Sequence, residues 1–200
     1  RKVELISDLK EALQNRGIIF TMLMFFLIQV CVMLLQPLIT MYVGQLMGKV
    51  DDEAVQMAGI IFSLAGISGI LAAPFWGKRG QQYGYVRTFC YITMGAGVVN
   101  LFQFFTTDVY QFAVVQFVYG LFLAGAIPNI NANLADVTDQ SIRGKAFGLV
   151  TSAQMAGGFV GPLLGGALGH VLPTRLVIIC AGVILIVMSV FTYINKVKAK

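Results

Sequence analysis

The side chains most capable of chemistry in this sequence are uncharged amides within long apolar stretches. Gln29 and Gln36 are seven residues apart, so a helix places them on nearly the same face. Amides like these and Gln154 either hydrogen-bond between helices, for about 0.6 kcal/mol each, or form part of a weakly polar cavity wall. Both interpretations stay open for these three residues. For Asn100 and Gln103, hydrogen bonding between helices is the favoured interpretation.

A serine motif raises the alternative of catalysis. The string Gly66-Ile67-Ser68-Gly69 is similar to the GxSG motif of rhomboid-type intramembrane proteases. A serine nucleophile needs a base within hydrogen-bond reach. The only histidine, His170, is expected at the outer end of another stretch, whereas Ser68 is expected on the cytoplasmic side of the midplane. We therefore interpret the string as a small-residue packing face and expect no enzyme activity.

Cysteines and nucleotide motifs give no indication of a metal or cofactor. The three cysteines lie far apart in apolar stretches, without CxxC or Cys/His spacing: Cys31, Cys90 and Cys180. The sequence has no P-loop and no glycine-rich dinucleotide fingerprint. We therefore expect neither a metal site nor a bound cofactor.

Carboxylates are kept out of the middle of the apolar stretches. The nine acidic residues lie outside these stretches or at their ends: Glu4, Asp8, Glu11, Asp51, Asp52, Glu53, Asp108, Asp136 and Asp139. A charge at the centre of a bilayer costs at least about 2.5–3.5 kcal/mol, so carboxylates there usually mark ion or proton pathways. This chain is therefore expected to carry no proton-transferring side chain at mid-depth.

Composition predicts that these residues are positioned by membrane-spanning helices. Hydrophobic residues make up 58% of the 200 residues, charged residues 12%, and the mean hydropathy is +0.81. A helix needs about 20 apolar residues to cross a bilayer, and runs of that length exclude transmembrane β-strands. Six stretches qualify: Ile18 to Tyr42, Ala54 to Trp76, Thr88 to Thr106, Tyr110 to Ile130, Ala146 to Gly169 and Leu176 to Asn195. The predicted fold class is an all-α membrane protein.

The basic residues predict how the chain is oriented. Of the 14 Lys and Arg residues, all except Lys49 and Arg175 lie at the termini or in the even-numbered loops. This excess places both termini in the cytoplasm and explains the positive charge without nucleic acid. We predict an amphipathic cytoplasmic linker over 1–16, a transmembrane domain over 17–195 and a basic tail over 196–200. Because the first residue is Arg1 and not Met, a longer natural chain is expected.

Glycines give the clearest packing signal. In the fifth stretch, glycines recur every four residues, at Gly157, Gly161, Gly165 and Gly169. This stripe without side chains lets another helix approach closely. Pro162 within it removes a backbone donor and bends the helix.

Two motifs in order carry a family resemblance. The string WGKRGQQYGYVR, from Trp76 to Arg87, follows the second stretch and contains Gly77 and Gly84. The string GGFVGPLLGG, ending at Gly166, lies in the fifth stretch. They resemble the G-x-x-x-D-x-x-G-x-[RK]-[RK] loop and the G-x-x-x-G-P-x-x-G-G element of major facilitator superfamily transporters, specifically bacterial twelve-helix drug–proton antiporters. Gln81 replaces the usual Asp, a departure that is typical of the C-terminal half.

The resemblance implies helices seven to twelve of such a transporter, built as two inverted three-helix repeats around a midplane site. Gln116, where the N-terminal half usually has Arg, agrees with this assignment. The cavity residues implied by the resemblance are Gln29, Met33, Gln36, Gln116 and Tyr119, with Gln154 and Phe159 from the fifth helix. The glycine stripe would then form a sliding or close-packed surface, and the proton-carrying acid would lie in the other half.

The implied function is export of small hydrophobic drugs across the plasma membrane, driven by proton import. The implied partners are the lipid bilayer, the N-terminal six-helix half and the substrate, and nucleic acid is not among them. One alternative is transport of another solute, such as a sugar or an organic anion. The anion is disfavoured because no cation lies mid-membrane to pair with it. An alternative from another class is a non-transporting six-helix scaffold.

Overall fold

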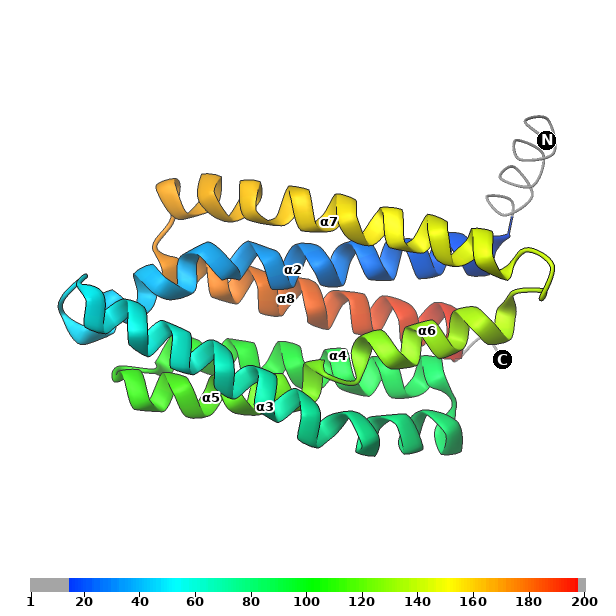
Figure 1. Cartoon of the computed structure of the whole chain (residues 1–200), viewed down its shortest axis with the longest axis horizontal. Coiled ribbons are helices and arrows are strands. Elements are labelled where there is room, and N and C mark those ends of the chain that lie inside the picture. Colours follow the sequence, from blue (N-terminus) through cyan, green and yellow to red (C-terminus); the bar gives the residue numbers. More distant parts are fainter. Residues whose placement is uncertain (1–14, 198–200) are drawn as a thin grey trace.

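The fold is an antiparallel bundle of helices. The computed structural model describes residues 15–197, and every element in that range is helical. Six segments are long and apolar enough to cross a membrane, and the first of them begins at the end of the bundle where the last one finishes (Figure 1). The predicted all-α, six-span fold is therefore confirmed. The predicted linker and basic tail lie outside the described residues, apart from positions 15, 16, 196 and 197.

The helical spans extend beyond the predicted apolar stretches at most ends. The elements are α2 (Arg16–Met47), α3 (Asp52–Tyr83), α4 (Tyr85–Phe102), η1 (Gln103–Phe105), α5 (Val109–Leu123), α6 (Ala126–Val137), α7 (Arg143–Val171), α8 (Thr174–Thr192) and η2 (Tyr193–Val197). Helices of 32 residues such as α2 and α3 are about 48 Å long at 1.5 Å per residue, which exceeds a hydrocarbon core of about 30 Å. Their ends therefore project into the interfacial layers.

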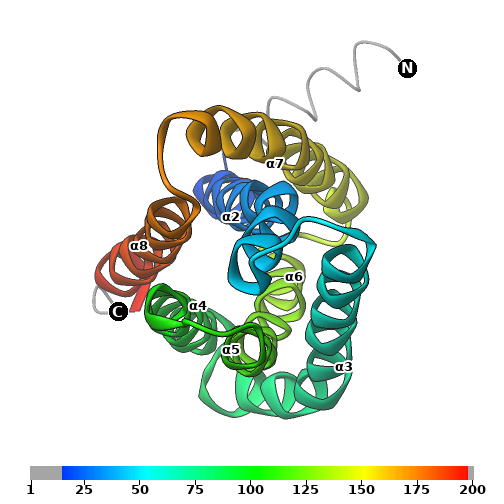
Figure 2. The same cartoon turned by 90° about the vertical axis from the view of Figure 1, so that its left-hand side faces the viewer.

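Local capping determines where α2 begins and ends. The side-chain oxygen of Asn15 accepts hydrogen bonds from the backbone N–H groups of Gly17 (2.8 Å) and Ile18 (3.4 Å). At the other end, Gly48 adopts φ 70°, a left-handed conformation that glycine accommodates without strain. Between these caps, α2 packs against both α7 and α8, and Figure 2 shows it toward the inside of the bundle.

Polar caps and a second glycine define α3. The side chain of Asp51 accepts a hydrogen bond from the backbone N–H of Ala54 at 3.1 Å, which satisfies a donor in the first turn. Asp51 also lies 3.5 Å from the ammonium of Lys49, which pairs with Glu53 as well. The helix ends at Gly84, whose φ of 90° turns the chain directly into α4.

The fourth span is broken, which differs from the uninterrupted helix predicted over 110–130. α5 ends at Leu123, and α6 begins at Ala126 and continues to Val137. Pro128 lies in the first turn of α6, where its missing N–H would otherwise have bonded to the carbonyl of Ala124. Gly125 lies at the break, and a methyl group there would come within 2.5 Å of Cβ of Trp76.

Side-chain hydrogen bonds connect α4 to α8 within the apolar interior. The amide of Asn100 donates to the carbonyl oxygen of Ile178 at 3.2 Å. The hydroxyl of Ser189 donates to the carbonyl oxygen of Cys90 at 2.7 Å. The predicted interhelical role of Asn100 is therefore confirmed. Both bonds satisfy donors that would be costly to bury alone in an apolar environment, while the side-chain oxygen of Asn100 has no hydrogen-bond partner among the described residues.

Candidate functional site

The main site is a cavity of about 460 Å³ between α2, α3, α5 and α6. Five residues implied by the family resemblance line it: Gln29, Met33, Gln36, Gln116 and Tyr119. Helix α2 contributes three of them because positions 29, 33 and 36 lie on one face. The first and fourth spans therefore meet at this cavity.

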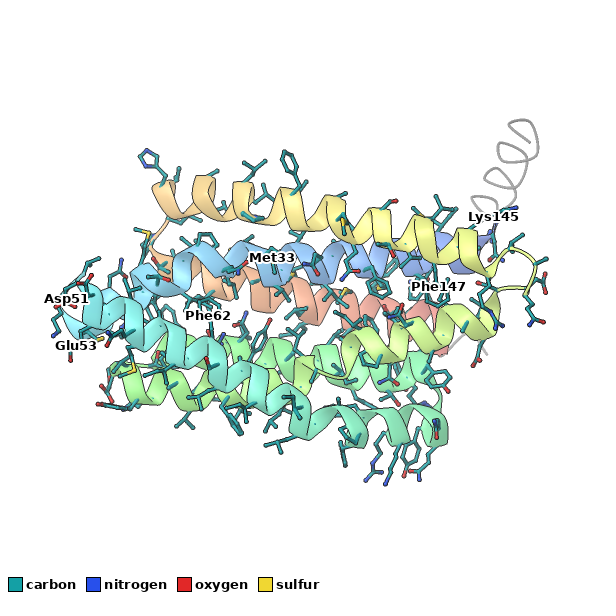
Figure 3. All side chains as sticks on the ribbon, in the orientation of Figure 1. Met33, Asp51, Glu53, Phe62, Lys145 and Phe147 are labelled. Carbon is teal, nitrogen blue, oxygen red and sulfur yellow. The ribbon has the colours of Figure 1, made fainter. Side chains whose placement is uncertain are left out.

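Sequence reasoning missed the contribution of α3 to this cavity. Phe62, Ala65 and Gly69 line it from that helix, and Figure 3 marks Phe62 on α3 and Met33 on α2. Their spacing of three and four residues is a helical face that the sequence already contained. Its small residues resembled packing positions, so they gave no signal of a cavity.

The lining is apolar apart from a few uncharged polar groups. Among its residues, the polar side chains are Gln29, Gln36, Gln116 and Tyr119, and none is charged. An apolar pocket with a few placed polar groups is the usual form of a small-molecule site. The electrostatics of this wall therefore suit an uncharged or largely hydrophobic surface of a ligand.

Gln116 is held in place by a buried hydrogen bond. Its side-chain oxygen accepts from the amide of Gln103 at 2.7 Å, and the two side chains are 5% and 1% exposed. The hydroxyl of Thr106 in turn donates to the carbonyl of Gln103 at 2.7 Å, and Arg175 donates to the carbonyl of Thr106 at 3.1 Å. The interhelical role predicted for Gln103 is therefore confirmed, and through it the end of the bundle that contains Thr106 and Arg175 orients Gln116.

Tyr119 presents a different situation on the same helix. Its side chain is 5% exposed, and within the described residues its hydroxyl has no hydrogen-bond partner. A buried hydroxyl without a partner costs about 1–3 kcal/mol. Tyr119 lines the cavity with Gln116, and its described contacts there are packing contacts.

Two of the implied cavity residues lie elsewhere. Gln154 on α7 is not in the cavity lining, and its amide lies 3.5 Å from the side-chain oxygen of Gln29. Phe159 is 71% exposed and is also outside the lining. Phe159 is two residues from Gly157, about 200° around the helix, so it faces away from α2 when Gly157 faces it. The family resemblance pointed to α7 and did not indicate which face of that helix these two residues occupy.

The glycine stripe packs α7 against α2. A methyl group at Gly157 would lie 2.6 Å from the carbonyl oxygen of Phe26, and one at Gly161 would lie 2.7 Å from Cβ of Met33. At Gly165 it would overlap the carbonyl oxygen of Leu34. The stripe is thus a close-packed interface inside the chain, with Pro162 half-buried beside it. Gly166 differs, because the space around it is open.

The loop motif lies at the end of the bundle where the described chain begins. Gln81, Gly84 and Arg87 line a second hollow of about 720 Å³ with residues of α6. Gly77 has open space around it. Gly80, which was not among the predicted motif residues, lies close against α6: a methyl group there would overlap the side-chain amide of Asn129. Its position between Gly77 and Gly84 in the loop motif was the feature of the sequence that could have indicated this role.

The serine motif acts in packing. Ser68 is fully buried, and its hydroxyl donates to the carbonyl oxygen of Ala65 at 2.7 Å. The side chain lies directly against Gly120 on α5. His170 lies in the last turn of α7 and is exposed. The arrangement of Ser68 is that of a helix-packing residue.

The bundle, with its six membrane-length helices, is that of a multi-span membrane protein, and the comparisons with known proteins show its family. The model of the Major Facilitator Superfamily matches residues 18–200, so the chain belongs to this superfamily. Among its relatives is "Multidrug resistance protein MdtG" of Yersinia enterocolitica, 29% identical over 180 residues. That match covers 90% of this chain and 43% of the relative. The same-named protein of Escherichia coli O1:K1 is 30% identical over 155 residues, 77% of this chain and 38% of the relative. The chain thus spans less than half the length of the curated relatives it matches.

Proposed function

We propose that this chain is the C-terminal half of a secondary transporter that exports small hydrophobic compounds in exchange for protons by alternating access. The observation that carries the proposal is the uncharged cavity on α2, α3, α5 and α6. The relatives are named multidrug resistance proteins, and alternating access of two such halves is the general mode of this architecture. The N-terminal six-helix half and the lipid bilayer are the proposed partners.

Hydrophobic compounds suit this cavity better than a sugar. A sugar presents many hydroxyl groups, each of which needs a hydrogen-bond partner when it leaves water. The lining offers few: two of its four polar side chains, those of Gln116 and Tyr119, are almost fully buried. Membership of a transporter superfamily likewise favours transport over the scaffold alternative.

Proton coupling is proposed to depend on the other half. The acidic residues that the structure describes lie at helix ends or in loops: Asp51, Asp52, Glu53, Asp108, Asp136 and Asp139. None of these six is at mid-depth, where a proton-carrying carboxylate would act. The acid is therefore proposed to lie beyond the part of the chain described.

The proposed orientation is a plasma-membrane protein with both termini in the cytoplasm. The even number of spans places residues 15 and 197 at one end, and the basic loops lie at that same end. Single cysteines at positions 78 and 49 should be labelled from opposite sides of the membrane. Labelling of both from the same side would refute the orientation.

The test of function uses the full-length transporter in proteoliposomes. We expect drug-dependent proton flux, and we expect Gln29→Ala and Gln36→Ala to change apparent drug affinity about two- to tenfold, the value of one hydrogen bond. Gln45→Ala is the matched control, because Gln45 is exposed on the same helix beyond the cavity. Unchanged kinetics with every drug would remove the two glutamines from the site, and absence of drug-dependent proton flux would refute antiport.

A further inference from the structure

An arginine near the end of α3 lies between two aromatic rings. The guanidinium of Arg79 is 5.2 Å from the ring centre of Phe75 and 5.3 Å from that of Tyr83. One of its N–H groups donates to the Tyr83 hydroxyl at 3.0 Å. Because the three residues are spaced by four, they form a continuous ridge along the helix. The rings hold the guanidinium in position through cation–π contacts.

This arginine has donors left over for a ligand. A guanidinium carries five N–H donors and is always charged. Among the described residues, Arg79 has no salt bridge to a carboxylate, and the Tyr83 hydroxyl is the hydrogen-bond partner of its side chain. The flanking rings of Phe75 and Tyr83 are 51% and 53% exposed. The site is therefore a fixed cation between exposed apolar surfaces.

The segment of α3 that carries the ridge borders α4. The hydroxyl of Thr88, in the first turn of α4, donates to the carbonyl of Arg79 at 3.2 Å. The cavity lies between α2, α3, α5 and α6 and receives no lining residue from α4. Helix α4 also exposes Tyr91 and Phe102, at 55% and 58%. This side of the bundle therefore faces lipid, away from the face where a second half would sit.

The depth of Arg79 matches the headgroup layer. The outer end of α3 is marked by Asp51, Asp52 and Glu53, so the hydrocarbon core begins near Ala54. A core of about 30 Å takes about 20 helical residues and ends near position 74, just before the interfacial ring of Trp76. Arg79 lies about one helical turn farther, where phospholipid phosphates lie. Phe75 lies at the edge of the acyl chains.

We propose that Phe75, Arg79 and Tyr83 form a binding site for the phosphate of an anionic phospholipid, in the leaflet at the end of the bundle that contains residue 15. Arginine binds phosphate through two parallel hydrogen bonds, and exposed cations nearby, such as Lys78, add to the attraction. The exposed Phe75 ring favours a lipid over soluble phosphate, because a lipid also offers acyl chains for it to contact.

The test compares lipids on the full-length protein. Native mass spectrometry would count lipids bound after reconstitution in an equimolar mixture of phosphatidylglycerol and phosphatidylcholine. We expect preferential retention of phosphatidylglycerol, and about tenfold weaker retention in Arg79→Gln. Arg79→Lys should fall between, since it keeps the charge and loses the paired hydrogen bonds. Lys78→Gln is the matched control, which removes the same charge from the adjacent position and should weaken retention by less than about fivefold.

Three results would overturn the proposal. Equal losses in Arg79→Gln and Lys78→Gln would show a diffuse charge effect with no site. Displacement of phosphatidylglycerol by soluble glycerol phosphate would show a site for free phosphate instead. Photo-crosslinking from benzoylphenylalanine at position 75 that reached only other parts of the chain would show that protein covers the ridge. The crosslink and the comparison of lipids on the unsubstituted protein remain decisive if Arg79→Gln does not fold.

Discussion

Replacing one stripe glycine by alanine is expected to destabilise the bundle, while the same change at its neighbour stabilises it. At Gly165, the new methyl group would overlap the carbonyl oxygen of Leu34 and lie 3.0 Å from its carbonyl carbon. These are backbone atoms, so no rotamer change relieves the contact. At Gly166, no atom beyond the neighbouring residues and backbone of its own helix lies within 4 Å of the new methyl group.

The magnitudes follow from two opposing terms. Overpacking a close interface costs about 1–3 kcal/mol. Alanine in a helix interior is about 0.5–1 kcal/mol more favourable than glycine. We expect Gly165→Ala to lose about 1–2 kcal/mol on balance, because its clash is with rigid backbone and falls in the upper part of the range. Gly166→Ala should increase the free energy of unfolding by up to about 1 kcal/mol, because it has the higher helix propensity of alanine and no clash.

The assay is reversible unfolding of the full-length protein in mixed micelles, read by the accessibility of buried cysteines or by circular dichroism. The two variants differ by one position and have the same composition, so any difference reflects where the methyl group points. Equal stabilities for Gly165→Ala and Gly166→Ala would refute the close approach of α7 to α2. Stabilisation in both would show that this interface has room for a side chain.

Two further perturbations test other parts of the structure. Gln103→Leu leaves the buried side-chain oxygen of Gln116 without its donor, so it should cost about 1–3 kcal/mol in unfolding free energy; no loss would show that water or another group replaces the bond. At the N-terminal end of α3, the backbone N–H of Ala54 and the ammonium of Lys49 lower the pKa of Asp51. Its contribution to stability should therefore be complete above the usual aspartate pKa and disappear as the pH falls through the lowered value. Asp51→Asn keeps the helix cap and should flatten this acid dependence in thermal unfolding, and an unchanged pH profile would assign the dependence to other groups.

The six spans could be predicted from the sequence because the bilayer imposes a length on every apolar helix. The break in the fourth span was harder to predict, because Gly125 and Pro128 lie inside an apolar run and hardly change its average hydropathy. The helical repeat would have predicted that Gly165 and Gly166 have different surroundings. Adjacent residues differ by about 100° around the helix axis and cannot both face α2. The same helical repeat would have predicted that Phe159 faces away from α2.

The family resemblance implied a cavity on α2 and α5 and not on α3. Gln29 and Gln36 stand out because amides are rare and costly in apolar helices. Gly69 and Ala65 are small and apolar, and such residues serve packing and cavity walls equally. The pairing of Gln103 with Gln116 depends on how η1 meets α5 in three dimensions, and no spacing along the chain encodes it.

Met33 belongs to two surfaces at once. Its side chain borders the cavity, and its Cβ lies 2.7 Å from the position that a methyl group would take on Gly161. Gln29 has the same double position beside Gly157, with its Cβ at 3.0 Å. A ligand in the cavity between α2, α3, α5 and α6 is thus separated from the backbone of α7 only by helix α2. A substitution in α7 at this interface is therefore expected to affect a ligand that it does not contact, through Gln29 and Met33 of α2.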